Sequence, residues 1–223
     1  MALNRLGAST ALIVMAKAPQ PGLAKTRLIP ALGAAGAAAL AARLLAHAVE
    51  EATASGVGPV HLFATPDPCD PHFTALAATH AVRLHAQGDG DLGARMQRAF
   101  DNVLATSARV LMIGTDAPAL TRTRLQEAAL ALDVVDVVEV GNVDGATDAV
   151  FVPAHDGGYA LIGLRRTATW LFDAMPWSTA EVMATTRARA SAAGWRIAEL
   201  APVHDIDEAS DLVHLPPSWA QAQ

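Results

Sequence analysis

The sequence predicts an α/β fold, a single domain whose mainly parallel, partly mixed sheet carries helices on both faces. Short apolar runs alternate along the chain with segments whose apolar residues recur at helical spacing, as expected for strands alternating with helices. With 223 residues, 52% of them hydrophobic, the chain can bury one sizeable core, so residues 1–223 are treated as one domain. Polar loops follow the predicted strands, and ligands of such sheets bind at the carboxyl ends of the strands.

The first half of the chain shows this alternation element by element. In chain order, we predict strands at 10–16, 60–64, 81–85 and 109–113, and helices at 32–55, 73–79 and 94–106. Gly56 ends the first helix, and Thr121 is a candidate N-cap for a helix after the fourth strand.

The second half is less regular. It predicts strands at 134–140, 148–152, 159–164 and 195–200 and a helix at 179–193, and the turn at 141–145 could join the first two strands as a hairpin. Asp207 is a candidate cap for a last helix, and Ser178 or Thr179 for the helix at 179–193. Alternatively, Trp177 and Ser178 contact a substrate.

Composition excludes several classes of protein. A formal charge of −6 argues against binding of nucleic acid, so any phosphate is expected on a small molecule. The lone Cys69 fits a reducing cytoplasm, no secretory signal is evident at the N-terminus, and the apolar run at 10–16 is too short for a membrane span. We predict a cytoplasmic protein, and a homodimer stays open because an apolar helix face serves a core or a partner equally well. The scattered histidines predict no zinc site, and no Gly-x-Ser-x-Gly motif indicates a hydrolase.

The lysines are the most specific signal in the chain. Both of them, Lys17 and Lys25, lie within twelve residues of each other, whereas the other fourteen basic residues are arginines. A strand that leads into a Pro/Gly-rich basic loop and then a helix is an arrangement that binds phosphate. Neither Gly-x-x-x-x-Gly-Lys-Ser/Thr nor a Gly-x-Gly-x-x-Gly after this strand is present. The alternative is that Lys17, Lys25 and Arg27 are a solvated loop.

A second glycine-rich loop, 87–93, matches Gly-x-Gly-x-x-Gly by letter at Gly88, Gly90 and Gly93. The dinucleotide fingerprint should follow the first strand, but this loop follows two earlier strands. It is either a loop that faces a nucleotide or a flexible connection.

Carboxylates follow several of the strands. Asp116, directly after a buried strand, is placed to ligate a divalent ion that phosphates also hold, and Asp205 or Asp207 can supply a second oxygen. Asp116 could instead bond its own backbone before Pro118. The turn at 156–158 either approaches a ligand, with Asp156 bonding a hydroxyl or the metal, or is a plain hairpin turn. We expect the lysine loop, the 87–93 loop, Thr115 with Asp116, and 204–207 to converge on one edge of the sheet.

Taken together, five motifs resemble those of a bacterial family with the glycosyltransferase type A fold. They lie at 16–28, 90–96, 114–118, 153–159 and 205–208. Members of that family are commonly labelled glycosyltransferases by inference, and the fold is shared with molybdenum cofactor guanylyltransferase and phospholactate guanylyltransferase. The resemblance covers residues 10 to 213. It therefore implies a nucleotide-diphospho-sugar transferase-like fold.

The resemblance also implies roles for individual residues. The loop at 16–27 would bind a nucleotide's phosphates, with Lys25 and Arg27 as its catalytic contacts, Asp116 would hold Mg²⁺ or Mn²⁺, and Asp205 or Asp207 would complete the metal's ligands. Substrate contacts would come from Lys17, Pro21, Gly22, Gly90, Asp91, Leu92, Gly93, Arg95, Thr115, Asp156, Gly157, Gly158, Trp177 and Ser178. Two departures from the family pattern concern the acceptor side: the segment 132–147 is long, and His155 stands beside the 156–158 turn.

Two reactions fit such a site. A nucleotidyltransferase would transfer a nucleotidyl group from a nucleoside triphosphate to a small phosphorylated or hydroxylated acceptor, whereas a glycosyltransferase would use a nucleotide sugar. Type A glycosyltransferases commonly carry Asp-x-Asp after the central strand, but here Asp116 is followed by Ala117 and Pro118. The basic loop also suits a triphosphate, so the sequence favours nucleotidyl transfer. A third possibility is a nucleotide-binding module without catalysis.

Overall fold

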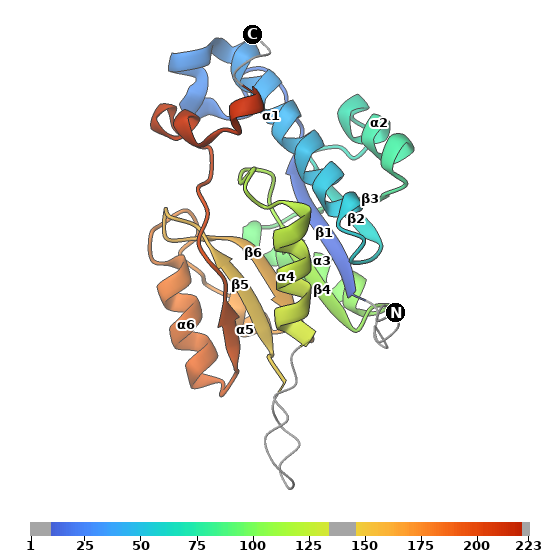
Figure 1. The fold of residues 1–223 in the computed structure, drawn as a ribbon, viewed down its shortest axis with the longest axis vertical. Helices are drawn as coiled ribbons and strands as arrows, with labels where there is room; N and C mark the ends of the chain where they lie inside the picture. The colour runs from blue at the N-terminus through green and yellow to red at the C-terminus, as the bar shows by residue number, and fades with distance from the viewer. Residues whose placement is uncertain (1–9, 134–145, 220–223) are drawn as a thin grey trace, which may run out of the picture.

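The computed structural model describes residues 10–133 and 146–219, which form a sheet of seven strands between two layers of helices (Figure 1). The strands are β1 (Thr10–Lys17), β2 (Val60–Thr65), β3 (Arg83–Ala86), β4 (Arg109–Ile113), β5 (Ala149–Pro153), β6 (Tyr159–Leu164) and β7 (Ile197–Glu199). Each corresponds to a predicted strand. The strand predicted at 134–140 and the turn at 141–145 lie outside the described residues.

The helices also follow the predicted order. They are α1 (Ile29–Ala54), α2 (Pro71–His80), α3 (Leu92–Leu104), α4 (Arg122–Asp133), α5 (Thr169–Phe172) and α6 (Val182–Ala192), with 3₁₀ turns η1 (Thr26–Leu28), η2 (Ala209–His214) and η3 (Pro217–Trp219). α1 begins three residues before its predicted start because Gly33, with φ 70° and ψ 166°, separates its first turn from the rest. α5 was not predicted, since one turn is too short to show a period.

The strand order across the sheet is β3-β2-β1-β4-β6-β5-β7. Only β6 runs against its neighbours among these strands: it pairs antiparallel with β4 and β5, and the remaining pairs are parallel. The predicted mainly parallel, mixed sheet is therefore confirmed. β1 and β4 lie side by side at the centre, so the loops that follow them share one edge of the sheet.

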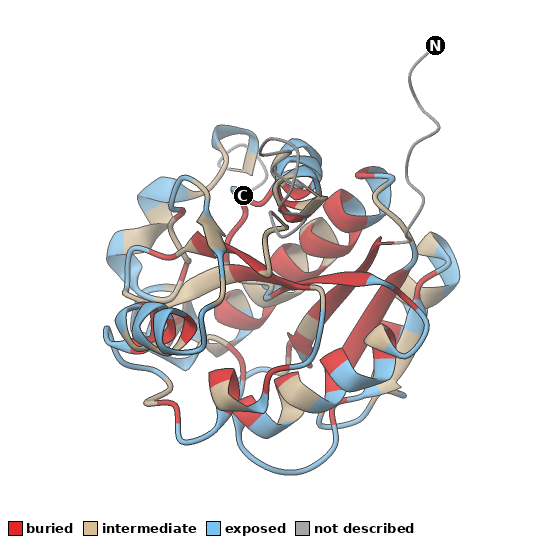
Figure 2. Ribbon diagram, turned by 90° about the horizontal axis from the view of Figure 1, so that it is seen from below, coloured by how far each residue is buried: buried red, intermediate tan, exposed pale blue. Residues whose placement is uncertain are grey.

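Two apolar clusters hold the layers together. On one face, α1, α2 and α4 pack Val49, Phe73 and Leu125 against the sheet, and on the other, α3 and α6 contribute Phe100 and Met183. Strands β1, β2, β4 and β5 are almost entirely buried between them, and buried segments are red in Figure 2, whereas β3 and β7 at the two ends of the sheet are partly exposed. Each fully buried side chain of this size stabilises the fold by about 1.5–3 kcal/mol relative to an exposed one.

The C-terminal segment crosses back over the sheet edge to the N-terminal half of α1, where η2 and η3 lie (Figure 1). Ile206, fully buried, packs with Leu28 and Leu44, and its backbone N–H donates to the Asp116 carbonyl at 2.8 Å. The guanidinium of Arg43 lies 4.3 Å from the ring of Trp219. These contacts bring residues 205–207 next to the loop after β4.

Two predicted helix caps are wrong. η2 begins after Glu208, which forms a capping box with Asp211, whereas the Asp207 side chain is bound to Lys25 instead. α6 begins after Glu181, not at Ser178 or Thr179. Ser178 has φ 63°, and the Thr179 hydroxyl donates to the Pro176 carbonyl at 2.8 Å, so both residues belong to a turn that precedes the helix.

One helical stretch within the described residues, Thr26–Ala54, is long and apolar enough to cross a membrane by length and composition. The core helix of a globular domain passes the same test, and Leu45, Val49 and Ala52 of this stretch pack in the cluster that covers the sheet. The stretch is therefore weak evidence for a span. The absence of a membrane span stays a prediction.

Candidate functional site

A cavity of about 480 Å³ lies at the carboxyl ends of β1 and β4. This volume is in the range of small-molecule sites. The predicted site residues that line it are Lys17, Lys25, Leu92, Arg95, Thr115, Asp116, Asp156, Gly158, Trp177, Ser178 and Asp205. The polar loops expected to converge on one edge of the sheet therefore do so, although a role for each residue stays a prediction.

The basic loop after β1 is a set of tight turns. The Ala18 N–H donates to the Thr65 carbonyl at 2.8 Å, which ties the loop to the end of β2. Gly22 has φ 79°, a conformation that glycine adopts without strain. The Lys17 ammonium donates to the Leu23 carbonyl at 2.9 Å and so closes the loop. Pro21 and Gly22 are exposed and do not line the cavity.

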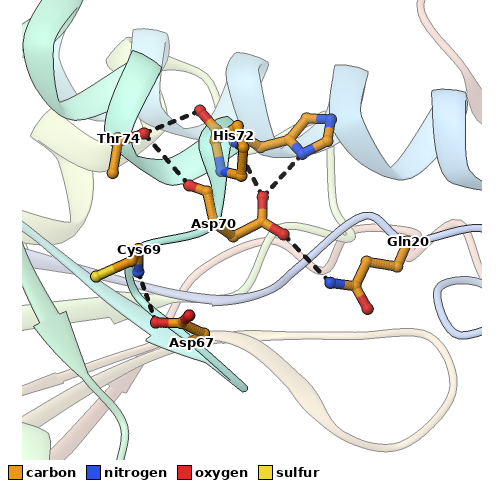
Figure 3. A network of polar contacts seen from close by, with 7 residues as sticks. Gln20, Asp67, Cys69, Asp70, His72 and Thr74 are labelled. Atoms are coloured by element: carbon orange, nitrogen blue, oxygen red, sulfur yellow. Dashed lines mark hydrogen bonds and ion pairs between the residues drawn. The ribbon is translucent and has the colours of Figure 1, made fainter.

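A polar network anchors the same loop to α2 (Figure 3). Asp70 caps α2 by accepting a hydrogen bond from the His72 N–H at 3.0 Å, and its other oxygen accepts one from the Gln20 amide at 3.2 Å. Burial would raise the pKa of Asp70, but hydrogen bonds from His72 and Gln20 hold it below its ordinary value. Gln20 thus couples the basic loop to a helix terminus on the same edge of the sheet.

Lys25 is the centre of the polar part of the cavity. Its backbone is left-handed, with φ 48° and ψ 47°, which an L-residue adopts at a cost of about 1–2 kcal/mol. The side chain is 9% exposed, and its ammonium forms ion pairs with Asp116 and, at 2.8 Å, with Asp207. Burial alone would lower the pKa of Lys25, but its two carboxylate partners raise it above the ordinary value. Lys25 is therefore charged.

Asp205 lies near this ammonium and near three further carboxylates. Burial raises the pKa of Asp205 to about 7, and repulsion from the carboxylates of Asp116, Asp156 and Asp207 adds to the shift. One ammonium cannot balance this negative charge. The cluster therefore has the electrostatic character of a cation site.

The carboxylates near Lys25 have the chemistry expected of ligands for the divalent ion that the family resemblance implies. Carboxylate oxygens are hard ligands and suit Mg²⁺ or Mn²⁺. Asp116 and Asp205 both line the cavity, whereas Asp207 does not. Within residues 10–133 and 146–219, no group of three or more acidic, His or Cys side chains is arranged to hold a metal alone. The residues thus fit an ion that two carboxylates and a ligand's phosphates would share, the common mode for Mg²⁺.

The second glycine-rich loop contributes fewer contacts than the sequence suggests. Asp91 caps α3 by accepting from the Ala94 N–H at 2.8 Å, and neither it nor Gly90 lines the cavity. Gly93 also lies outside, because a Cβ there would come within 2.6 Å of the Phe172 carbonyl oxygen. Leu92 and Arg95 do line the cavity, with the Arg95 guanidinium donating to the Gly90 carbonyl at 2.9 Å.

Sequence reasoning placed Gln87 in the 87–93 loop but did not single it out as a site residue, although it is a buried cavity residue directly after β3. Its side-chain amide donates to the carbonyls of Ala16 and Phe63, both at 2.9 Å, so it joins the ends of β1 and β2. Arg98, also missed, holds the Gln87 and Asp89 carbonyls from α3. The sequence signal that could have identified Gln87 is a polar residue directly after a predicted strand, but this signal does not show that the side chain is buried.

The turn at 156–158 joins β5 to β6 as a hairpin. The Gly158 N–H donates to Asp156 at 2.8 Å, and both residues line the cavity. Gly157 serves packing instead: its φ is 93°, and a Cβ there would lie 2.5 Å from Ala180 Cα. The sequence predicted that a ligand approaches these glycines closely. At Gly157 the backbone of Ala180 takes that place, and the contact holds the loop before α6 against the hairpin.

Arg27 lies outside the cavity. Its side chain is 66% exposed and approaches Glu208 at 3.9 Å. The left-handed Lys25 turns the chain into η1, and Arg27 leaves on the solvent side. No contact between Arg27 and the carboxylate cluster is found in the described part of the chain.

Rings and methionines form the apolar part of the cavity, and of these the sequence singled out Trp177 alone. Met15, Met96 and Met112 line it from β1, α3 and β4. Tyr159 of β6 and Trp177 meet edge to face, with ring centroids 6.4 Å apart. Burial raises the pKa of Tyr159, so its hydroxyl stays protonated.

A stack of histidine rings flanks the carboxylates. His155 and His204, which precede Asp156 and Asp205, have ring centroids 4.0 Å apart, and His204 lies 3.6 Å from His214. Burial and the neighbouring rings lower the pKa of His204. The stack joins the hairpin turn to the C-terminal segment.

The fold and this cavity define a class, the α/β proteins with the nucleotide-diphospho-sugar transferase fold. A protein from Desulfovibrio desulfuricans G20, described as a "putative nucleotide-diphospho-sugar transferase", is 26% identical, with a TM-score of 0.81 over 97% of this chain and 90% of that chain. The chain belongs to the bacterial family DUF2064, described as "Uncharacterized protein conserved in bacteria", whose model matches residues 48–179. The comparison with curated proteins found no match.

More distant solved structures share the fold alone. A 4-diphosphocytidyl-2C-methyl-D-erythritol synthase from Anaerococcus prevotii has a TM-score of 0.61 at 10% identity, covering 96% of this chain and 97% of that chain. CMP:2-keto-3-deoxy-manno-octonic acid synthetase, complexed with CTP, has a TM-score of 0.58 at 12% identity, and the match covers 97% of this chain and 100% of that chain. The family and fold expected from the five motifs are thus confirmed.

Proposed function

We propose that this protein is a nucleotide-dependent transferase that moves a nucleotidyl group from a nucleoside triphosphate to a hydroxyl of a small acceptor. One observation carries the proposal: the Lys25 ammonium lies between Asp116 and Asp207 beside Asp205, at the edge of the sheet where β1 and β4 end. The fold is shared with a CTP-bound synthetase and with cytidylyltransferases, which supports a nucleotide donor.

The donor's phosphates would lie against the loop after β1. Lys25 exchanges one carboxylate partner for a phosphate oxygen, which its flexible stem permits, and Lys17 supplies a second positive charge at the same edge. Asp116 and Asp205 would hold Mg²⁺ or Mn²⁺. When bound, such an ion neutralises phosphate charge and stabilises the leaving pyrophosphate.

In the chemical step, the acceptor hydroxyl oxygen forms a bond to the α-phosphorus. The bond between that phosphorus and the bridging oxygen to the β-phosphate breaks, so pyrophosphate leaves with the electron pair. Asp156 Oδ2 accepts the hydroxyl proton, because Oδ1 is already bonded to the Gly158 N–H. Lys25 stabilises the charge that develops on the phosphates.

Glycosyl transfer is the second candidate, because the 26% identical protein is described as a nucleotide-diphospho-sugar transferase. The loop after β4 favours nucleotidyl transfer. Asp116 is followed by the buried Ala117 and Pro118, so the Asp-x-Asp pair common in type A glycosyltransferases is absent there. A binding module without catalysis would not need Asp116, Asp156 and Asp205 in one cavity.

The test offers pooled nucleoside triphosphates and, separately, nucleotide sugars with Mg²⁺ and a panel of hydroxylated acceptors. We expect pyrophosphate release from a triphosphate, abolished in Asp116→Asn, with circular dichroism confirming that this variant is folded. Nucleoside diphosphate release from a nucleotide sugar would instead establish glycosyl transfer. Release of neither product, or normal turnover by Asp116→Asn, would contradict the proposal.

A further inference from the structure

The cavity has two chemically different sides, and the strand order separates them. Lys17 follows β1 and Gln87 follows β3, on one side of β4, whereas β6 and the β5–β6 hairpin lie on the other side of it. The second side, here called the far wall, is formed by Asp156, Gly158, Tyr159, Trp177, Ser178 and Thr179. If the phosphates lie against Lys25 and Asp116, the far wall faces the acceptor.

The residues of the far wall include no lysine or arginine. Within the described residues, the cations that line the cavity are Lys17, Lys25 and Arg95, from the loop after β1 and from α3. The far wall carries the carboxylate of Asp156. A phosphate bound there would meet this carboxylate and no lysine or arginine of the far wall. Like charges juxtaposed without a partner oppose binding strongly.

The remaining far-wall groups suit hydroxyls and an apolar ring face. Tyr159 and Trp177 meet edge to face and supply a rigid aromatic surface. The Ser178 hydroxyl makes no hydrogen bond within residues 10–133 and 146–219, and Ser178 is held in the left-handed region at φ 63°. Strained residues cluster at ligand sites. Asp156 Oδ2 and the Ser178 hydroxyl are thus available to bond sugar-like hydroxyls.

We infer that the acceptor is an uncharged, polyhydroxylated ring compound of the sugar or cyclic polyol class, bound by the far wall, and that phosphorylated acceptors are excluded. This inference rests on the proposed function, because it takes the phosphate position from Lys25 and Asp116. It holds for nucleotidyl and for glycosyl transfer alike, and it narrows the acceptor from a phosphorylated or hydroxylated molecule to a neutral one.

Saturation-transfer NMR and titration test the inference. A non-hydrolysable nucleoside triphosphate is first shown to bind with Mg²⁺. Glucose, galactose, mannose and myo-inositol, each beside its monophosphate, are then added to that complex. We expect at least one neutral compound to bind about tenfold or more tightly than its monophosphate. Trp177→Leu should weaken that binding about tenfold, while Trp195→Leu, which removes a ring outside the cavity, should not.

The other outcomes distinguish failure of the proposed function from failure of the inference about the acceptor. If no nucleotide binds, the proposed function falls and the inference falls with it. If the nucleotide binds but monophosphates bind more tightly, or no neutral compound binds in a Trp177-dependent way, the inference alone is wrong. If Trp177→Leu weakens nucleotide binding by the same factor, the far wall holds the nucleobase and the inference is also wrong.

Discussion

Replacing Lys25 by Met removes the positive charge between Asp116 and Asp207 and keeps a side chain of similar length. At 2.8 Å and an effective dielectric of about 20, one such ion pair has a Coulomb energy of about 6 kcal/mol before solvation. The side chains of Asp116 and Asp207 are 44% and 42% exposed, so water screens much of this Coulomb energy. The stability lost should therefore lie between that of breaking an exposed salt bridge and that of breaking a buried one. We expect Lys25→Met to lower the free energy of unfolding by about 2 kcal/mol, or Tm by about 4–8 °C.

Although Lys25→Met should be less stable than the wild type, it should bind divalent metal more tightly. In the wild type, Mn²⁺ or Mg²⁺ must displace the ammonium from the carboxylates, at a cost similar to that of losing the ion pair. Lys25→Met should therefore bind Mn²⁺ alone about tenfold to thirtyfold more tightly, and saturating Mn²⁺ should restore much of its Tm. Thermal denaturation and electron paramagnetic resonance of free Mn²⁺ measure the two effects.

The matched control is Arg27→Met, which removes an exposed charge 3.9 Å from Glu208. It should change the free energy of unfolding by less than about 0.5 kcal/mol and leave Mn²⁺ affinity unaltered. Equal Mn²⁺ affinity in the wild type and Lys25→Met, or weaker binding by the variant, would refute the idea that Lys25 occupies the position of a cation.

Three further predictions concern pH, packing and a buried amide. Because the pKa of Asp205 is raised to about 7, the free energy of unfolding falls as the pH rises from the ordinary carboxyl pKa through that value. Without metal and at a pH near 8, Asp205→Asn should therefore be up to about 4 kcal/mol more stable than the wild type, and this difference should vanish in acid. Urea titrations at several pH values measure the difference. Gly157→Ala should lower the free energy of unfolding by about 2–4 kcal/mol, because the new Cβ would clash with Ala180. Gly194, also at positive φ, has open space around it, so Gly194→Ala should lower the free energy of unfolding by only about 1 kcal/mol in the same assay. Equal losses would mean that packing against Ala180 is unimportant. Gln87→Ala removes two buried hydrogen bonds and should lower Tm by an amount that corresponds to about 2 kcal/mol; an unchanged Tm would show that the strand ends do not depend on this amide.

The sheet could be predicted because its central strands are continuous apolar runs. β4 was expected at 109–113 and occupies those residues, since every one of them is buried. A strand buried on both faces shows no alternation, and its length and its polar flanks delimit it instead. The same reasoning placed Asp116 and the basic loop at one edge, because parallel strands end on the same side.

The directions of side chains within the loops could not be predicted. Lys25 points into the cavity and Arg27 away from it, because a single left-handed residue turns the chain between them. Gly157 and Gly158 are adjacent, yet the first packs on Ala180 and the second faces the cavity. Such differences depend on backbone dihedrals that tertiary contacts impose, and sequence spacing carries no record of them.

The apolar side of the cavity was missed for another reason. Met15, Met112 and Ile162 lie in strands whose side chains all read as core, and their position at the carboxyl end of the sheet becomes visible only in three dimensions. Trp177 was weighed as a substrate contact but not as part of an aromatic surface. Its partner Tyr159 comes from β6, eighteen residues earlier in the chain, and no local pattern links the two.

The most direct measurement is the effect of Mg²⁺ on nucleotide affinity. Calorimetric titrations of the wild type and Asp116→Asn with a non-hydrolysable nucleoside triphosphate would each be run with Mg²⁺ and with EDTA. A nucleotide site that holds its metal through Asp116 predicts that Mg²⁺ raises affinity at least about tenfold in the wild type and has little effect in the variant. An affinity independent of Mg²⁺, an equal gain in the variant, or no binding of any nucleotide would contradict it.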